Sequence, residues 1–182
     1  MKPILLSILR DRLTPTAQFR GAANELFALM AVEESLQIND HDLIVIVAIL
    51  RSGAAPLPFF LHTFANAPVG FYGIKRDENT AMPQKYYENI PLLSPENHLL
   101  LLDPMIATGG SAHLAISDLI SKGANASRIT IISAIAALPG IDRIHKQFPL
   151  VKIKAAATDK QLDAKKFIVP GLGDFGDRYF GT

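Results

Sequence analysis

Residues 99–111 read LLLLDPMIATGGS, and this stretch decides the fold. Four consecutive leucines predict a strand that is buried on both faces, as is typical of a parallel sheet. Asp103 follows the strand, a loop of small residues comes next, and Ser111 begins a segment with helical spacing. Gly123 then stands where a helix commonly ends. The stretch therefore predicts a buried strand, a short loop and a helix, in that order.

The same alternation continues on both sides of this stretch. Uninterrupted apolar runs predict the other strands, at about 43–50, 69–74, 129–137 and 151–157. Helical spacing predicts helices at about 15–36, 54–64, 111–122 and 139–148. Strands that alternate with helices indicate an α/β fold with a doubly wound, mainly parallel sheet flanked by helices. Ligands of such folds bind beyond the carboxyl ends of the strands.

Three segments do not follow this alternation. Residues 4–9 are apolar, but the charged residues 10–12 end the run too early for a signal peptide, so we expect ordered protein. The polar segment 75–94 is long enough to be a mobile hood. The tail, 167–182, is too glycine-rich for regular structure yet too apolar for disorder, which predicts a shaped loop. Because the sequence has no segment with the composition of a linker, we expect residues 1–182 to form a single domain.

The composition excludes several classes of protein. The chain has 18 Lys+Arg against 17 Asp+Glu, and a net charge of +1 provides no field to hold nucleic acid or a membrane surface. It has no cysteine, which excludes disulfides, thiolate metal sites and thiol nucleophiles. No apolar stretch approaches the roughly 18 residues needed to cross a bilayer. The five histidines lack zinc-site spacing, and the acids form no metal cage. We expect a soluble, cytoplasmic protein.

The loop after the four leucines has the residue types of a phosphate site. Glycines expose the amides at a helix N-terminus, and Thr108 and Ser111 add hydroxyl groups, so that the loop can cradle a phosphate dianion. Asp103 is suited to accept hydrogen bonds from ribose hydroxyls. The alternative is that Gly109 and Gly110 only permit a tight turn. The loop is neither a Walker A, a GxGxxG nor a GxSxG motif, which disfavours an ATPase, a dehydrogenase and a serine hydrolase.

Two arginines are candidates for binding a second anionic group. Arg51 follows the predicted strand 43–50, and an arginine there is costly to bury without a counter-ion, which a bound polyanion would supply. Alternatively, it turns to solvent or pairs with a local carboxylate. Arg76 lies in the polar segment, where a mobile arginine can close over a leaving group and exclude water. Most other charges of that segment are expected to be solvated.

The sequence resembles one enzyme family. Residues 99–112, LLLLDPMIATGGSA, closely resemble the loop that binds phosphoribosyl pyrophosphate (PRPP) in uracil phosphoribosyltransferases, where a proline follows a single acid. Residues 49–53, ILRSG, look like the family's Ile-Leu-Arg-Ala-Gly turn, and residues 72–80 are similar to its flexible segment with a pyrophosphate-binding arginine. The tail 167–182 reads almost like the family's base-binding tail. The resemblance covers most of the chain.

The resemblance implies a phosphoribosyltransferase that joins uracil to the ribose of PRPP, giving UMP and pyrophosphate. It also implies Mg²⁺ bound mainly through PRPP, and a homodimer. The implied catalytic residues are Arg51, Arg76 and Asp103. The implied PRPP contacts are these three with Pro104, Met105, Ile106, Ala107, Thr108, Gly109, Gly110, Ser111 and Asp174. The implied uracil contacts are Ile168, Gly173, Asp174 and Phe175.

Three departures from the family leave alternatives open. The chain runs almost directly from helix to strand between Asn39 and Val45, where better-known relatives insert a substantial segment. Ser52 replaces the usual alanine, and Phe175 also stands where relatives usually have alanine, so that a bulky ring would shrink or reshape the base pocket. The alternatives are a non-catalytic PRPP- or nucleotide-binding regulatory protein on the same fold, or a phosphoribosyltransferase for another nucleobase. No residue stands out as a general base.

Overall fold

The computed structural model describes residues 1–39, 42–76 and 83–182. Its main sheet consists of β1 (Leu43–Leu50), β2 (Val69–Arg76), β3 (Pro83–Asn89), β4 (Asn97–Leu102), β5 (Met105–Ile106), β6 (Ile129–Ala137) and β7 (Lys152–Asp159). The strand order is β3-β2-β1-β4-β6-β5. Strands β4 and β5 pair one after the other along one edge of β6, and β7 pairs along the opposite edge. Among the described strands of this sheet, only the pair β2–β3 is antiparallel. The predicted mainly parallel sheet is therefore confirmed.

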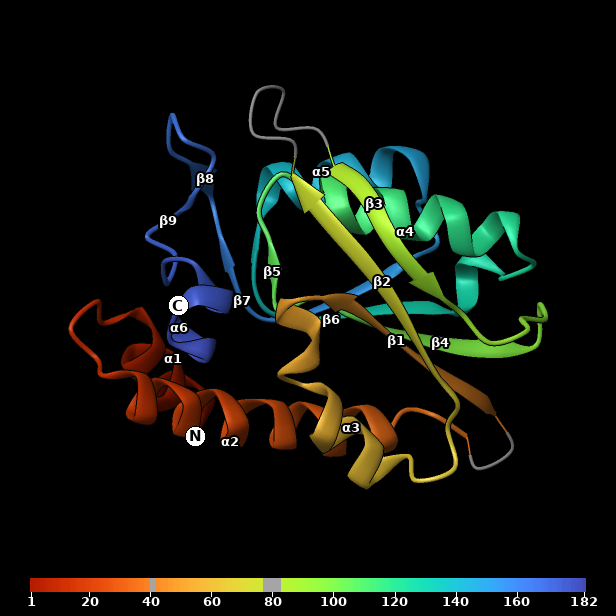
Figure 1. Ribbon diagram of the computed structural model, residues 1–182, viewed down its shortest axis with the longest axis horizontal. Coiled ribbons are helices and arrows are strands. Elements are labelled where there is room, and N and C mark those ends of the chain that lie inside the picture. Colours follow the sequence, from red (N-terminus) through yellow and green to blue (C-terminus); the bar gives the residue numbers. More distant parts are fainter. Residues whose placement is uncertain (40–41, 77–82) are drawn as a thin grey trace.

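Helices cover both faces of the sheet (Figure 1). They are α1 (Lys2–Arg10), α2 (Thr16–Ser35), α3 (Leu57–Thr63), α4 (Gly110–Ser121), α5 (Leu138–Gln147) and α6 (Phe175–Phe180). Figure 1 shows α2 and α3 on one face and α4 and α5 on the other, which is the doubly wound arrangement that the sequence predicted. None of the helices in the described residues has the length and apolar character needed to span a membrane.

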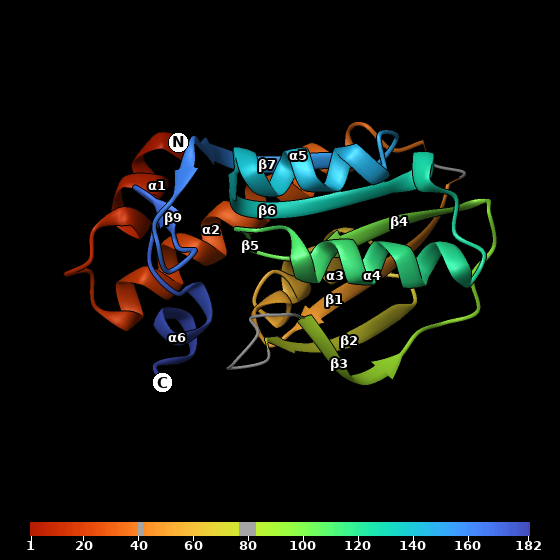
Figure 2. The same ribbon diagram turned by 90° about the horizontal axis from the view of Figure 1, so that it is seen from above.

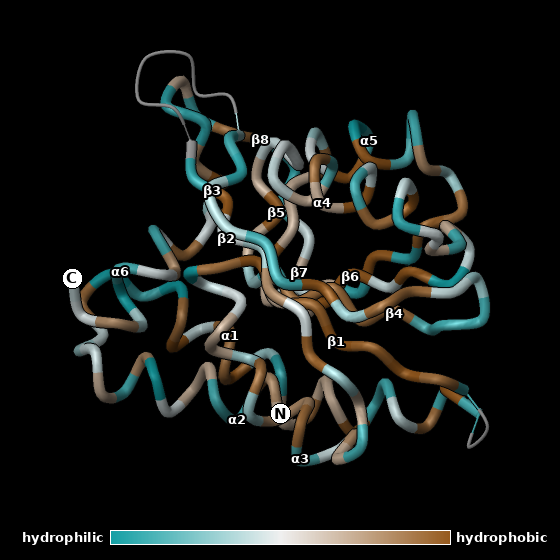
Figure 3. The backbone as a smooth tube through the Cα atoms, turned by 45° about the vertical axis from the view of Figure 1, so that its right-hand side comes forward, coloured by the Kyte–Doolittle hydropathy of each residue, from teal (hydrophilic) through white to brown (hydrophobic). Residues whose placement is uncertain are grey.

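The central strands are buried on both faces. Ile46 and Leu100 belong to the core on the side of α2 and α3, whereas Val47 and Leu101 belong to the core under α4 and α5. Successive side chains of a strand point to opposite faces, so a strand between two helical layers must be apolar at every position. Figure 3 shows β1, β4 and β6 as a hydrophobic band through the middle of the molecule.

The winding direction of the sheet reverses between β1 and β4. From β1 the chain passes through α3 to β2 on one side, whereas β4 leads through α4 to β6 and through α5 to β7 on the other. The two strands pair from Leu43–Asn97 to Ala48–Leu102. The segments that follow them therefore begin side by side, at the switch point where α/β proteins bind their ligands.

Two predicted segments are organised differently in the structure. The predicted helix at 54–64 is a short 3₁₀ turn at Ser52–Ala54 followed by α3, because Pro56 and Pro58 are compatible only with the first turn of a helix. The polar segment 75–94 also contains β3, which pairs with β2. Residues 77–82 of the predicted hood lie outside the described residues, and its mobility stays a prediction.

The prediction that the tail has no regular structure is wrong. Strand β9 (Ile168–Val169) pairs with β8 (Gln161–Leu162), and α6 follows. The carboxylate of Asp174 caps α6 by accepting a hydrogen bond of 3.0 Å from an amide of the first turn. Gly181 ends the helix with a φ of 78°, a left-handed conformation that glycine adopts without strain. Caps at both ends therefore stabilise a helix in a glycine-rich segment.

The two ends of the chain meet beyond the carboxyl ends of the parallel strands (Figures 1 and 2). Helix α1 packs on α2, and α2 contacts α6. The guanidinium of Arg20, on α2, donates hydrogen bonds of 2.8 and 3.0 Å to the carbonyl oxygen of Tyr179, on α6. The N-terminal helices thus support the tail that the sequence predicts for base binding.

Candidate active site

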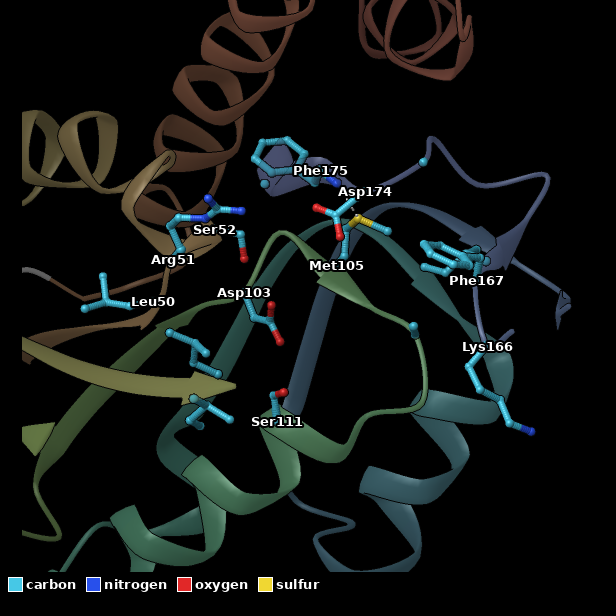
Figure 4. A pocket seen from close by; sticks show the side chains of 16 residues that line it. Leu50, Arg51, Ser52, Asp103, Met105, Ser111, Lys166, Phe167, Asp174 and Phe175 are labelled. Carbon is cyan, nitrogen blue, oxygen red and sulfur yellow. Dashed lines mark hydrogen bonds between the residues drawn. The ribbon is translucent and has the colours of Figure 1, made fainter. Parts of the chain in front are cut away.

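A pocket of about 280 Å³ opens at the switch point of the sheet. The turn after β1, the loop after β4 and the tail all line it (Figure 4). The lining includes the predicted residues Arg51, Asp103, Met105, Ala107, Ser111, Ile168, Gly173, Asp174 and Phe175. Tertiary folding therefore brings together the three segments that the sequence suggested for one site.

Several other predicted residues lie near the pocket without lining it: Pro104, Ile106, Thr108, Gly109 and Gly110. Ile106 packs in the core under α4, so any contact with a ligand would have to come from its main chain. Arg76 is the last residue of β2, and its side chain lies outside what the structure describes.

The pocket also has lining residues that the sequence reasoning did not assign to a ligand: Ile49, Leu50, Ser52, Ile74, Lys166, Phe167 and Gly176. Lys166 lies in the turn between β8 and β9 with a φ of 67°, which is uncommon for a residue other than glycine. The carboxylate of Asp163 accepts hydrogen bonds of 2.8 and 2.9 Å from the amides of Lys165 and Phe167, which holds this turn. Phe167 could have been predicted from the sequence, because it directly precedes Ile168, a predicted base contact. No feature of the sequence indicated that Lys166 lines the pocket.

The loop before α4 presents free backbone donors. Within the described residues, the amides of Thr108, Gly109, Gly110 and Ser111 donate no hydrogen bond to the protein. The first backbone bond at this end of α4 runs from His113 N–H to the carbonyl oxygen of Gly109, at 2.9 Å. Free amides at the positive end of a helix favour an anion. The loop therefore has the chemistry of the predicted phosphate cradle.

Asp103 brings a carboxylate to the pocket beside this loop. Its amide donates a hydrogen bond of 3.1 Å to the carbonyl oxygen of Ile132 on β6, which holds the residue at the end of β4. The residue is 7 % exposed. Figure 4 shows its carboxylate and the hydroxyl groups of Ser52 and Ser111 turned toward the same space. This position suits the predicted contact with the hydroxyl groups of a ribose.

Arg51 is paired with a carboxylate, which is one of the alternatives that the sequence left open. Its Nη2 donates to Oδ1 of Asp177 at 2.7 Å, and its Nη1 donates to Oγ1 of Thr182 at 3.2 Å. The guanidinium also lies 5.7 Å from the centre of the Phe180 ring, within the range of a cation–π contact. All three partners belong to the C-terminal tail, so the turn after β1 and the tail are directly connected.

The ring of Phe175 lies in the core, contrary to the expectation that it would shrink or reshape the pocket. It is 1 % exposed and stacks on Tyr179 with a centroid distance of 5.5 Å. It also contacts the rings of Phe19 at 5.5 Å and Phe27 at 5.8 Å. On the pocket side, its amide donates a hydrogen bond of 3.3 Å to Sδ of Met105 (Figure 4). Phe175 therefore faces the pocket with its main chain.

The β2–β3 hairpin is anchored to α4 by polar contacts. The hydroxyl of Tyr72 donates to Oδ2 of Asp118 at 2.9 Å, and Nζ of Lys85 donates to the same oxygen at 2.7 Å. Burial and the bond to Asp118 raise the pKa of Tyr72. Burial alone would raise the pKa of Asp118, but the bonds from Lys85 and Tyr72 lower it. Because α4 begins at the cradle and β2 ends at Arg76, this network fixes the position of the end of β2 relative to the cradle.

The pocket is suited to a metal ion that arrives with a ligand. In residues 1–39, 42–76 and 83–182, no group of three or more His, Asp or Glu side chains could hold a metal ion. Among the residues that the structure describes, the carboxylates that line the pocket are those of Asp103 and Asp174. Mg²⁺ commonly keeps its waters and binds through one or two carboxylates together with the phosphate oxygens of a substrate. These two acids therefore fit such an ion.

Comparison with known proteins identifies the family. A family model described as "Uracil phosphoribosyltransferase" matches residues 32–182. The uracil phosphoribosyltransferase of Lactococcus lactis is 37% identical over 195 residues, covering 97% of this chain and 92% of that protein. The one from Bacillus licheniformis is 38% identical, with the same coverage.

Solved structures share the fold of this chain. The AQ2163 protein from Aquifex aeolicus has a TM-score of 0.87 and 31% identity, covering 99% of this chain and 95% of that one. An adenine phosphoribosyltransferase from Leishmania tarentolae has a TM-score of 0.60 at 15% identity over 74% of this chain and 70% of that one, a likeness that shows the fold alone. The family model and the curated relatives show that the chain belongs to the uracil phosphoribosyltransferase family.

Proposed function

We propose that this protein transfers the phosphoribosyl group of PRPP to uracil, which gives UMP and pyrophosphate. The observation that carries the proposal is the set of amides at Thr108–Ser111, which donate no hydrogen bond within the described residues, next to a pocket that Asp103, Ser111 and the tail line. A sugar phosphate needs both features, a cradle for its phosphate and an acceptor for its hydroxyl groups. The family to which the chain belongs supports uracil as the base.

Each part of the pocket has a proposed role in binding PRPP. The 5′-phosphate lies in the loop 107–111 on the amides of residues 108–111, the ribose hydroxyls bond to Asp103, and the pyrophosphate lies near Arg51. Arg76 closes over the pyrophosphate from the hairpin. Pro104, Met105 and Ile106 shape the loop between the ribose and the cradle, and Asp174 lies beside the PRPP from the tail.

The tail is proposed to bind the base. Uracil presents an N–H flanked by two carbonyl oxygens, and main-chain donors and acceptors of Ile168, Gly173 and Phe175 can match that edge. The bond between the anomeric carbon and pyrophosphate breaks first, with its electron pair leaving on the pyrophosphate; the base nitrogen then bonds to the sugar carbon and releases its proton to the departing pyrophosphate or to solvent. Arg51 and Arg76 stabilise the negative charge of the departing pyrophosphate in a site that excludes water. Mg²⁺ bound through the PRPP oxygens would add further charge neutralisation.

The same proposal covers the whole protein and its assembly. We propose that residues 1–182 form one phosphoribosyltransferase domain, because the turn after β1, the loop after β4 and the tail all line one pocket. A homodimer is proposed because large apolar side chains such as Leu36, Leu43 and Leu92 are exposed. We propose a cytoplasmic location, since PRPP is highly charged and does not cross membranes unaided. Sedimentation velocity would test the dimer, and cell fractionation would test the location.

A base panel tests the activity. Uracil, cytosine, hypoxanthine and xanthine are each incubated with PRPP and Mg²⁺, and nucleotide formation is measured. We expect UMP alone to form, and formation to stop when the divalent cation is chelated. PRPP binding without turnover of any base would instead indicate the regulatory protein, and turnover of a purine would indicate another phosphoribosyltransferase.

The Arg76→Ala variant tests the role given to the hairpin. A large fall in turnover with a weaker loss of base binding is expected, because Arg76 is assigned to the pyrophosphate and not to the base. An unchanged rate would refute that assignment.

A further inference from the structure

Arg10 and Asp159 form a two-point ion pair close to the tail. Arg10 is the last residue of α1, and Asp159 is the last residue of β7. Nη1 and Nη2 of Arg10 donate to Oδ2 and Oδ1 of Asp159 at 2.8 and 2.7 Å. The side chain of Asp159 is 6 % exposed. Paired bonds between a guanidinium and a largely buried carboxylate hold both partners in one geometry.

This ion pair holds one particular residue of the tail. The amide of Gly171 donates to Oδ2 of Asp159 at 2.8 Å, and the carbonyl oxygen of Gly171 accepts from Nη1 of Arg10 at 3.0 Å. Gly171 has a φ of 62°, and a side chain there would overlap the carbonyl oxygen of Ile168. Both main-chain polar groups of Gly171 are thus used by the pair, so its main chain is fixed and is not available to a base.

A second arginine holds the next part of the tail to the end of α1. Nη1 of Arg178 donates to the carbonyl oxygens of Leu9 and Leu172 at 2.5 and 2.6 Å, and its Nη2 donates to that of Asp11 at 2.6 Å. The guanidinium lies 4.2 Å from the centre of the Phe19 ring. The tail is therefore attached to the end of the N-terminal helix on both sides of Gly173.

We propose that Arg10 and Asp159 are positioning residues for the base site, an inference that rests on the proposed function. Among the described residues that line the pocket neither appears, so they act on the base only through Gly171. Gly171 stands between Ile168 and Gly173, whose main-chain groups are proposed to contact uracil. When fixed main-chain donors and acceptors bind a base, small displacements of these groups weaken the binding. Arg10 lies outside residues 32–182, the part matched by the family model.

Steady-state kinetics of Arg10→Met test this inference. The KM for uracil should rise about tenfold, because the tail loses its fixed shape. The KM for PRPP should change less than about twofold, because Asp174 is the proposed PRPP contact on the tail, whereas the cradle, Asp103 and Arg51 do not touch Arg10. Lys2→Met is the matched control: it removes a cation of the same helix that pairs with Glu33 and leaves the tail contacts intact. Equal rises in both KM values, or an unchanged KM for uracil, would overturn the inference.

Asp159→Asn provides a second route if Arg10→Met is unstable, and the double variant tests the coupling of the two residues if it is stable. Asparagine has the same shape and keeps one acceptor, so the variant should fold and show a smaller rise in the KM for uracil. In the double variant, the fold-rise in the KM for uracil should be smaller than the product of the fold-rises in the two single variants, because both residues act through Gly171. Rescue in part by Arg10→Lys, which keeps the charge, would support the same role.

Hydrogen exchange separates this inference from the proposed function. The amide of Gly171 should exchange faster in Arg10→Met than in wild type, while the amides of β1 and β4 remain equally protected. Hydrogen exchange does not depend on turnover. A wild type that forms no UMP would therefore refute the proposed activity, while exchange at Gly171 would still test the role of Arg10. Unchanged exchange at Gly171 would refute the positioning role even if UMP is formed.

Discussion

The guanidinium of Arg51 and the carboxylate of Asp177 lie 2.7 Å apart, and this ion pair joins the turn after β1 to the first turn of α6. The turn carries a residue proposed for the pyrophosphate, and the tail that contains α6 is proposed for the base. Both side chains are about half exposed. A pyrophosphate bound at Arg51 would share the charge of the guanidinium with Asp177, so the two halves of the site compete for one cation.

Asp177→Asn should therefore strengthen inhibition by pyrophosphate. An exposed ion pair contributes about 0.2–1 kcal/mol, which limits the gain in pyrophosphate affinity to about fivefold. The measurement is product inhibition by pyrophosphate at varied PRPP. Glu33→Gln, which removes the carboxylate of an exposed ion pair on α2, controls for the change in net charge. Weaker inhibition in Asp177→Asn would mean that Asp177 orients Arg51 for the pyrophosphate instead of competing with it.

The cradle predicts opposite effects for its two adjacent glycines. Gly109 has a φ of 72°, and a Cβ there would lie 2.6 Å from the carbonyl oxygen of Gly140. Gly109→Ala should lower the free energy of unfolding by about 1–2 kcal/mol or more, because the left-handed conformation and the contact both cost energy. At Gly110 the nearest atoms to a Cβ are 3.6 Å away, so Gly110→Ala should be neutral or stabilising by up to about 1 kcal/mol. Urea denaturation of both variants would decide, and equal stabilities would contradict this account of the turn.

The burial of Phe175 predicts a loss of stability without a change of substrate. Phe175→Ala should lower the free energy of unfolding by about 3–5 kcal/mol, because it leaves a cavity among Phe19, Phe27 and Tyr179. The preference among bases should stay the same, since the ring lies outside the pocket. Phe167→Ala is the matched comparison, because that ring is 43% exposed at the pocket wall. There we expect little loss of stability and a higher KM for uracil. A change of base preference in Phe175→Ala would contradict the assignment of its ring to the core.

The ion pair of Asp159 predicts a dependence of stability on pH. Burial alone would raise the pKa of Asp159, but the bonds from Arg10 and Gly171 lower it below the ordinary value. A carboxyl group with a lowered folded pKa stabilises the fold above its unfolded pKa of about 3.9, and this contribution is lost as the pH falls through the folded pKa. The difference in unfolding free energy between wild type and Asp159→Asn should therefore be full at about pH 7 and shrink below about pH 4.

Urea denaturation of both proteins across this range measures that difference, with Glu33→Gln as the comparison for an exposed carboxylate. A difference between wild type and Asp159→Asn that stays constant with pH would contradict the role given to the Asp159 carboxylate.

The sequence predicted the buried strands well because burial on both faces leaves a local signature. The run at 43–50 has the bounds of β1, and the runs at 99–102 and 129–137 match β4 and β6 to within two residues. Strand β3 was missed because an exposed edge strand with the sequence PQKYYEN carries no such signature, and its pairing with β2 makes it a strand. Helix α6 was missed because its caps, and not its composition, stabilise it.

The sequence by itself determined the layered α/β fold and placed Arg51 and Asp103 after two buried strands, since apolar runs and loop residues are local properties of the chain. Tertiary structure alone decided that Arg51 pairs with Asp177, that the ring of Phe175 lies in the core, and that Arg10 forms an ion pair with Asp159. Each of these contacts joins residues far apart in the chain. Their geometry depends on how the helices pack against the sheet, and no local pattern carries that information.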